Sequence, residues 1–234
     1  MTSRCRFSSR CCSEGVDDFI LATGRLGEQQ IIEEASAGNV PVVLVNRDSG
    51  VGRYPFVSSD NESGIIAALT HLVELGHRHI VHVAGPPNFS TALSRSKAFQ
   101  AAALDVGILH DTINAESFTV DAGCAAAEGL LQRRAERPTA LVAGNDLVAL
   151  GLIRRLRSHG LGCPQDVSIV GFNDMPFAED FWPPLTTVHV PLREIGGEAA
   201  RLLLHGIESG EQEAAMVTLP VSLVVRGSTG RPRT

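Results

Sequence analysis

The feature that most constrains the fold is a repeated alternation of short apolar runs with longer stretches of helical spacing. Such alternation is typical of βαβ units, which build a mostly parallel sheet with helices on its faces. Strands are predicted at 17–22, 41–45, 79–85, 116–120, 138–144 and 166–172, and an extended segment at 216–229. Helices are predicted at 27–37, 61–76, 90–107, 121–135, 145–160 and 191–210. The sequence therefore predicts an α/β fold.

Composition limits the class of protein. The 234 residues include 44% hydrophobic and 20% charged residues, as in ordinary soluble globular proteins. The net charge of −6 argues against a chain that grips nucleic acid or anionic lipid over its whole surface, although a separate basic module stays compatible with it. No apolar run approaches the ~20 residues of a membrane span. The first fifteen residues lack the apolar core of a secretory signal.

Few residues suggest bond-breaking chemistry. A dinucleotide fingerprint, a phosphate-binding loop and a nucleophile elbow are all missing from the sequence. The histidines at 71, 77, 79 and 82 cluster, but the spacing of three puts His79 and His82 on opposite faces of a strand, so surface or capping roles are expected in place of a metal site. Cys124 has no neighbouring base. We predict no catalytic residues, no metal and no cofactor.

The five cysteines are odd in number and unevenly spaced, which favours reduced thiols and a cytoplasmic protein. The basic end RGSTGRPRT is expected to be a frayed, solvated terminus.

Polar or turn-forming residues follow four of the predicted strands. These are the segments 46–48, 85–87, 145–146 and 173–174. In parallel sheets, ligands bind outside the carboxyl ends of the strands. Each segment alone is also explained as a helix cap or a turn, but together they predict a rim that binds a small polar molecule.

Sugars and similar ligands are held by amides and carboxylates, by a bidentate arginine and by a flat apolar surface. Residues that could supply these groups are Asn145, Asn173, Asp174, Arg95, Phe89, Phe118 and Trp182.

Several longer stretches resemble the sensor domain of the LacI/GalR transcription factors. The resemblance covers residues 16 to 229 and is most specific over 138–187. The stretches are VSSDNESG, HLVELGHRHIVHVAGPP, STALSR, PTALVAGNDLVALG, DVSIVGFNDMPFAEDFWPPLTTV and PLREIGGEAARLLL.

The resemblance implies a type I periplasmic-binding-protein-like fold of two Rossmann-like subdomains with parallel sheets and an effector cleft between them. Residues 16–61 and 188–212 would form the N-terminal subdomain, and residues 62–187 and 213–234 the C-terminal one. Residues 1–15 are unassigned and expected to be disordered. Because the opening βαβα unit of such domains is not recognisable, the N-terminal subdomain is expected to be incomplete.

The resemblance also assigns roles in the cleft. Arg95 would supply the guanidinium, Thr91 a hydroxyl, Phe118 the stacking ring and Asn145 an amide. The family commonly has Asp where this chain has Asn173, so the pattern of ligand hydroxyls is open.

Two further positions depart from or extend that pattern. Phe89 replaces a residue that is often polar in the family, which indicates a more apolar ligand face. Asp60 is either a helix cap and domain contact or an effector contact.

The expected function is effector sensing, with a sugar as ligand, in a homodimeric DNA-binding regulator. DNA contact would depend on a helix-turn-helix module that is not visible in this sequence, and no membrane partner is expected. A periplasmic sugar-binding protein and an α/β enzyme are the alternatives. The first needs a signal peptide, and the second needs a catalytic or nucleotide-binding constellation.

Overall fold

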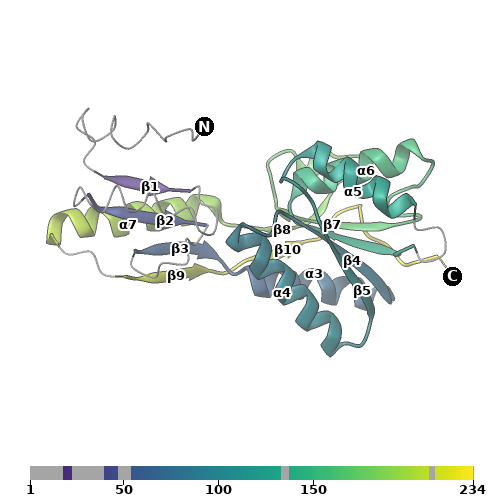
Figure 1. Ribbon diagram of the computed structural model, residues 1–234, viewed down its shortest axis with the longest axis horizontal. Coiled ribbons are helices and arrows are strands. Elements are labelled where there is room, and N and C mark those ends of the chain that lie inside the picture. The colour runs from purple at the N-terminus through teal and green to yellow at the C-terminus, as the bar shows by residue number, and fades with distance from the viewer. Residues whose placement is uncertain (1–17, 23–39, 47–53, 133–136, 211–213, 234) are drawn as a thin grey trace, which may run out of the picture. The chain divides into compact units, whose positions relative to one another are not determined.

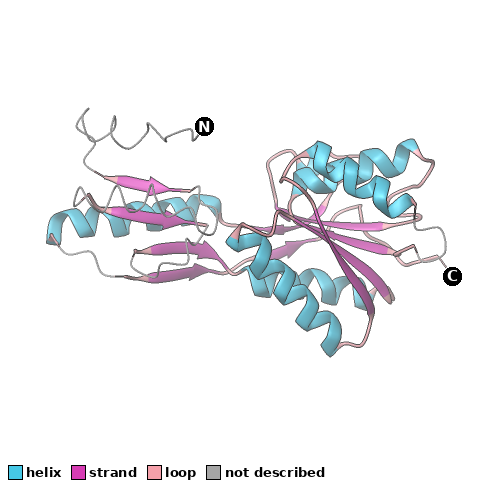
Figure 2. Cartoon of the chain, in the orientation of Figure 1, coloured by secondary structure: helices cyan, strands magenta, loops and turns pink. Residues whose placement is uncertain are grey.

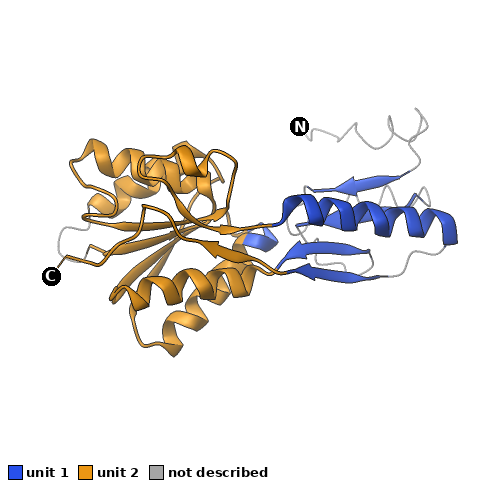
Figure 3. Cartoon of the chain, turned by 180° about the vertical axis from the view of Figure 1, so that it is seen from behind, with its two compact units in different colours: residues 1–59, 88–91, 191–219 blue, residues 60–87, 92–190, 220–234 orange. Residues whose placement is uncertain are grey.

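The computed structural model describes residues 18–22, 40–46, 54–132, 137–210 and 214–233. The chain divides into two compact units (Figure 3). Unit 1 comprises residues 1–59, 88–91 and 191–219, and unit 2 comprises residues 60–87, 92–190 and 220–234. The predicted helix at 27–37 and the expected disorder of 1–15 lie outside the described residues.

Unit 1 contains a parallel sheet with one long helix. In the described residues its four strands lie in the order β1 (Phe19–Leu21), β2 (Val42–Val45), β3 (Phe56–Ser59) and β9 (Met216–Leu219). Helix α7 (Leu192–Ser209) packs against β1, β2 and β3 (Figure 1). It ends at Gly210, whose φ of 69° is a left-handed conformation that suits glycine. Val42 and Leu44 are buried beneath Phe19 and Phe56.

Unit 2 is built on a six-stranded sheet. The order is β10 (Ser222–Val224), β8 (Thr186–His189), β7 (Ser168–Asn173), β6 (Ala140–Ala143), β4 (His79–Ala84) and β5 (Leu109–Asn114). All neighbours pair in parallel except β10 with β8. Helices α5 (Val120–Leu131) and α6 (Asp146–Ser158) cover one face, and α3 (Asn61–Glu74) and α4 (Ser90–Asp105) cover the other (Figures 1 and 2). This is the predicted α/β architecture with parallel sheets.

Helices α5 and α6 approach each other closely because glycines lie at their contact. A Cβ on Gly123 would lie 2.2 Å from the carbonyl oxygen of Val148, and one on Gly151 would lie 2.1 Å from that of Val120. No other residue type fits this spacing without moving a backbone. The close packing of α5 against α6 fixes the position of the start of α6, which follows β6 directly.

Two predictions about the elements are wrong. The strand expected at 116–120 is instead a turn and the start of α5, because Thr119 caps that helix by accepting from the Ala122 amide at 3.3 Å. The strand in this region is β5, which pairs with β4.

The predicted boundary between 212 and 213 is also wrong, because β9 pairs with β3 in unit 1. The units divide between 219 and 220, and also at 59/60 and 190/191, where 61/62 and 187/188 were expected. The short segment 88–91 also groups with unit 1, which was not expected.

Residues 226–230 of the predicted frayed end RGSTGRPRT are packed onto the sheet of unit 2. Ser228 is fully buried. Its hydroxyl accepts from the Thr186 amide at 2.8 Å and donates to the Ile169 carbonyl at 2.6 Å, while the Ile169 amide donates to the Ser228 carbonyl at 2.8 Å. Ser228 therefore anchors this segment to the sheet, which the composition of the segment did not indicate.

The expected surface or capping roles are wrong for two of the histidines. His77 is 1% exposed, with Nδ1 2.9 Å from Thr139 Oγ1 and Nε2 2.9 Å from the Gly230 carbonyl oxygen. His82 is fully buried, with Nδ1 2.8 Å from the Val142 carbonyl oxygen. Within the described ranges, no group of three or more His, Cys, Asp or Glu side chains could hold a metal ion. In the same ranges, no helix is both long and apolar enough to cross a membrane.

Candidate ligand-binding site

Arg95 is the charged centre of the candidate site in unit 2. Its side chain lies on α4 and is 3% exposed. Nε donates to Asn61 Oδ1 at 2.7 Å, and Nη1 donates to the Gly144 carbonyl at 2.6 Å. The guanidinium carbon lies 3.6 Å from the centroid of the Phe172 ring. These contacts hold a planar, permanently charged group in one orientation at the carboxyl ends of β6 and β7.

The position of the Phe172 ring requires a glycine at residue 64, which faces the ring. A Cβ on Gly64, in α3, would lie 2.9 Å from the Phe172 Cζ atom. The ring is fully buried. The platform beneath Arg95 is therefore fixed by packing, with little freedom to rotate.

Asn145 and Phe118 lie beside one another. Asn145 is the N-cap of α6, since its Oδ1 accepts from the Val148 amide at 2.8 Å. Its Nδ2 donates to the Phe118 carbonyl at 3.3 Å. The Phe118 ring covers Gly85, where a Cβ would lie 2.1 Å from the ring's Cζ. The capping explanation for Asn145 is thus correct, and the same contact brings the aromatic ring to the carboxyl end of β4.

A close contact of two glycines joins these groups to Arg95. A Cβ on Gly144 would lie 2.8 Å from the amide nitrogen of Gly85. Gly144 also provides the carbonyl that accepts from Arg95, and Gly85 lies under Phe118. Unit 2 therefore brings Arg95, Phe118 and Asn145 to one region, as the sequence predicted.

Asn173 ends β7 and Asp174 follows it, and both have a positive φ, of 114° and 55°. The Asp174 carboxylate is already paired, with Oδ1 2.8 Å from Arg226 Nη2 and Oδ2 3.0 Å from His189 Nδ1. Both carboxylate oxygens of Asp174 therefore contact other residues of the chain, which gives this side chain a structural role. Asn173 is half-buried and is the nearer of the two to Phe172 along the chain.

Asp146 was not selected from the sequence, but it positions this loop. It is fully buried, and its two carboxylate oxygens accept from the Met175 amide at 2.8 Å and the Thr187 hydroxyl at 2.6 Å. Burial raises the pKa of this carboxyl, and the hydrogen bond from Thr187 partly opposes that shift. An Asp in the first turn of a helix is normally solvated, so no signal in the sequence indicates this role.

The remaining predicted residues differ in outcome. Asp60 caps α3, with Oδ1 accepting from the Ser63 amide at 3.0 Å and Oδ2 from the Ser63 hydroxyl at 2.7 Å, which confirms the capping alternative. Thr91 is buried one helical turn before Arg95 on α4, and Phe89 is half-buried just before that helix. Both belong to the segment 88–91, which groups with unit 1, and their ligand contacts stay predictions.

In unit 1, considered by itself, one residue that was noted in the sequence but not selected has an unusual environment. Asn46 follows β2 with a φ of 62°, and its buried Oδ1 has no hydrogen-bond partner in the described part of the chain. An unsatisfied buried amide oxygen is costly, so it marks a position where a ligand hydroxyl could donate. The signal in the sequence is an Asn placed directly after a buried strand.

Parallel sheets with a fixed guanidinium and amides at the carboxyl ends of their strands define a binding protein of the periplasmic-binding-protein type. Residues 69–229 match the family described as periplasmic binding protein-like domain, and the chain belongs to that family. Within it, the chain is a member of the LacI/GalR group, as the relatives below show.

Two curated relatives are transcriptional regulators. MalR of Streptomyces coelicolor is 38% identical over 225 residues, which cover 92% of this chain and 64% of MalR. CelR of Thermobifida fusca is 36% identical over 203 residues, which cover 85% of this chain and 58% of CelR. The chain thus spans less than two thirds of each. Both are HTH-type regulators and not enzymes, in agreement with the prediction of no catalytic role.

Two solved structures have the same fold. A CelR–cellobiose complex has a TM-score of 0.89 and 32% identity, covering 95% of this chain and 69% of its own. A LacI family regulator from Enterococcus faecium with bound ribose has a TM-score of 0.87 and 30% identity, covering 100% of this chain and 86% of its own.

Proposed function

We propose that this chain is the ligand-sensing part of a LacI-type transcriptional regulator and that it binds a sugar or a similar small polar molecule. The observation that carries the proposal is the orientation of the Arg95 guanidinium, which Asn61, Gly144 and Phe172 hold at the carboxyl ends of the strands. A rigid planar donor suits the paired hydroxyl oxygens of a sugar. The bound cellobiose and ribose of the two structural relatives support this ligand class.

The other groups of the site fit the same chemistry. The half-buried ring of Phe118 offers a flat apolar face to the C–H side of a sugar ring. Asn173 carries an amide, which both donates and accepts and has no charge. The ligand would therefore be neutral and rich in hydroxyl groups.

Regulation would follow from a difference in ligand affinity between conformations of the sensor. Contact with DNA is proposed for a helix-turn-helix module like the one in the names of the relatives, and not for the residues described here. A cytoplasmic homodimer is part of the same proposal, and dimeric Lac repressor is among the structural relatives.

The test is a thermal-shift screen of the purified chain against cellobiose, maltose, ribose and glucose, followed by calorimetric titration. A sugar at 100 times its Kd should add about 2.7 kcal/mol to the free energy of unfolding. Asn173→Asp should change the affinity for the best sugar roughly tenfold, because it replaces a donor with a charged acceptor. Gln100→Glu makes the same change from amide to carboxylate at an exposed position on α4; it is the matched control and should leave the affinity unchanged.

Two results would count against the proposal. The first is a screen in which no sugar raises the melting temperature. The second is an equal change of affinity in the two variants, which would show that Asn173 does not contact the ligand.

A further inference from the structure

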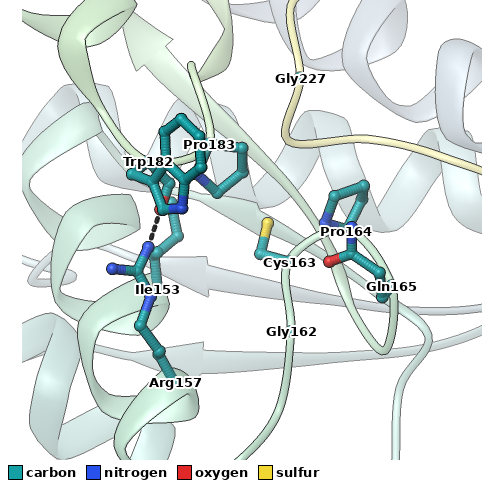
Figure 4. A pocket seen from close by; sticks show the side chains of 9 residues that line it. All are labelled: Ile153, Arg157, Gly162, Cys163, Pro164, Gln165, Trp182, Pro183 and Gly227. Carbon is teal, nitrogen blue, oxygen red and sulfur yellow. Dashed lines mark hydrogen bonds between the residues drawn. The ribbon is translucent and has the colours of Figure 1, made fainter.

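Unit 2 contains a pocket of about 300 Å³ near the C-terminal end of α6 (Figure 4). Arg157, in the last turn of α6, lines it, whereas Asn145 caps the other end of the same helix. At 1.5 Å per residue the two positions are separated by roughly 18 Å along the helix axis. The pocket is therefore distinct from the site around Arg95.

The walls of this pocket are mostly apolar. Figure 4 shows Trp182, Pro183 and Ile153 on one side, with Pro164 and Gln165 on the other. The indole of Trp182 is 78% exposed, which is unusual for the largest apolar side chain. The flat ring of a ligand could cover the Trp182 indole and so remove apolar surface from water.

The one formally charged side chain that lines the pocket is Arg157, which is a donor. Arg157 donates through Nη2 to the Trp182 carbonyl, and among the described residues it forms no ion pair with a carboxylate. Its neighbour on the helix, Arg155, is instead paired with Glu128 at 2.9 Å. No Asp or Glu lines the pocket, and Gln165 adds an amide.

The Cys163 thiol does not add a negative charge to this pocket. Burial raises its pKa to about 12, and Sγ lies 3.4 Å from the Ser228 carbonyl oxygen. The thiol is neutral at physiological pH and forms part of the floor. Arg157 therefore supplies the net charge of the lining, which is positive.

We propose that this pocket binds a small carboxylate that carries one apolar ring. The carboxylate would pair with the Arg157 guanidinium, which suits a planar two-oxygen anion. The ring would lie against Trp182 and Pro183. A volume of about 300 Å³ is at the lower end for ligand pockets, so it has room for one ring and its acid group.

The test uses Trp182, which is the single tryptophan of the sequence, so its emission reports on this pocket. The full chain is titrated with cyclohexanecarboxylate, which does not absorb at the excitation wavelength. We expect a saturable change in emission. Cyclohexanemethanol, which has the same ring and no charge, should give a curve at least about tenfold weaker.

Arg157→Gln should weaken cyclohexanecarboxylate binding by about tenfold or more. Arg154→Gln removes an equally exposed arginine from the same helix but outside the pocket, and should have no effect. Thermal melts of both variants check that they fold. Equal affinities of the two variants, equal binding of acid and alcohol, or an emission change that never saturates would each overturn the proposal.

Discussion

The guanidinium carbon of Arg95 lies 3.6 Å from the centroid of the Phe172 ring, and both side chains are buried. A lysine at position 95 would keep the charge but lose the planar fork that bonds Asn61 and Gly144. Arg95→Lys should therefore lower the free energy of unfolding by about 1–3 kcal/mol. Urea denaturation measures this change.

Ligand binding separates this role from general stability. In calorimetric titration with the sugar found by screening, Arg95→Lys should bind at least about tenfold more weakly at a temperature where it is fully folded. Lys97→Ala, an exposed change on the same helix, should match the unchanged chain. If Arg95→Lys binds the sugar with full affinity, Arg95 does not take part in ligand binding.

The contact between Gly85 and Phe118 gives a second prediction. Gly85→Ala would place a Cβ 2.1 Å from the ring, so the ring must move away from the carboxyl end of β4. We expect a loss of about 1–3 kcal/mol in stability together with weaker sugar binding. Gly129→Ala, within α5 and with nothing within 4 Å, should instead be neutral or stabilise by about 0.5–1 kcal/mol. Urea denaturation and titration of both variants distinguish these outcomes.

The buried hydroxyl of Ser228 gives a third prediction. Ser228→Ala removes the bonds to the Thr186 amide and the Ile169 carbonyl, and should lower the free energy of unfolding by about 1–3 kcal/mol. Ser222→Ala, at an exposed position on β10, is the control and should change it little. If chemical denaturation gives the same midpoint for both, the segment after β10 is not held as described.

Burial of His82 makes stability depend on pH. Desolvation lowers the pKa of this imidazole to about 4, which the bond to the Val142 carbonyl only partly opposes. The folded chain therefore binds fewer protons than the unfolded chain between about pH 4 and 6.5, and stability falls as pH falls through this window. From pH 7 to pH 5 the loss from this group should be about 2 kcal/mol. The pKa values of His71 and His77 are also lowered by burial, which adds in the same direction.

Urea denaturation at pH 7 and pH 5 tests this prediction. His82→Gln should reduce the difference between the two pH values by about 2 kcal/mol, since glutamine can donate to Val142 without titrating. His205→Gln, exposed on α7, should keep the full difference. An unchanged difference in His82→Gln would show that other groups cause the pH dependence.

Much of the fold was predictable where apolar runs are long and β-branched. The strands β2, β4, β6 and β7 and the cap at Asn145 were found in this way, because buried parallel strands cannot hold polar side chains without partners. The strand β5 was missed because its sequence, LHDTIN, is polar and lies at the edge of the sheet. Edge strands bury less surface, so their pattern is weak.

The errors at His77 and Ser228 have one cause. Each polar side chain is buried because a partner distant in the sequence satisfies it, such as Gly230 for His77 and Ile169 for Ser228. Composition and local spacing contain no information about such partners. The candidate site was predictable for the opposite reason, since the carboxyl ends of parallel strands meet at one edge whatever the sequence between them.

The chain passes between its units at 59/60, 87/88, 91/92, 190/191 and 219/220. A protease that cuts one of these connections would nick the polypeptide without releasing either unit, because the other covalent links remain. For the same reason neither unit is a contiguous cassette that recombination could exchange with a relative in one step. A chimera that keeps one unit and replaces the other needs a join at every one of these connections, all in register.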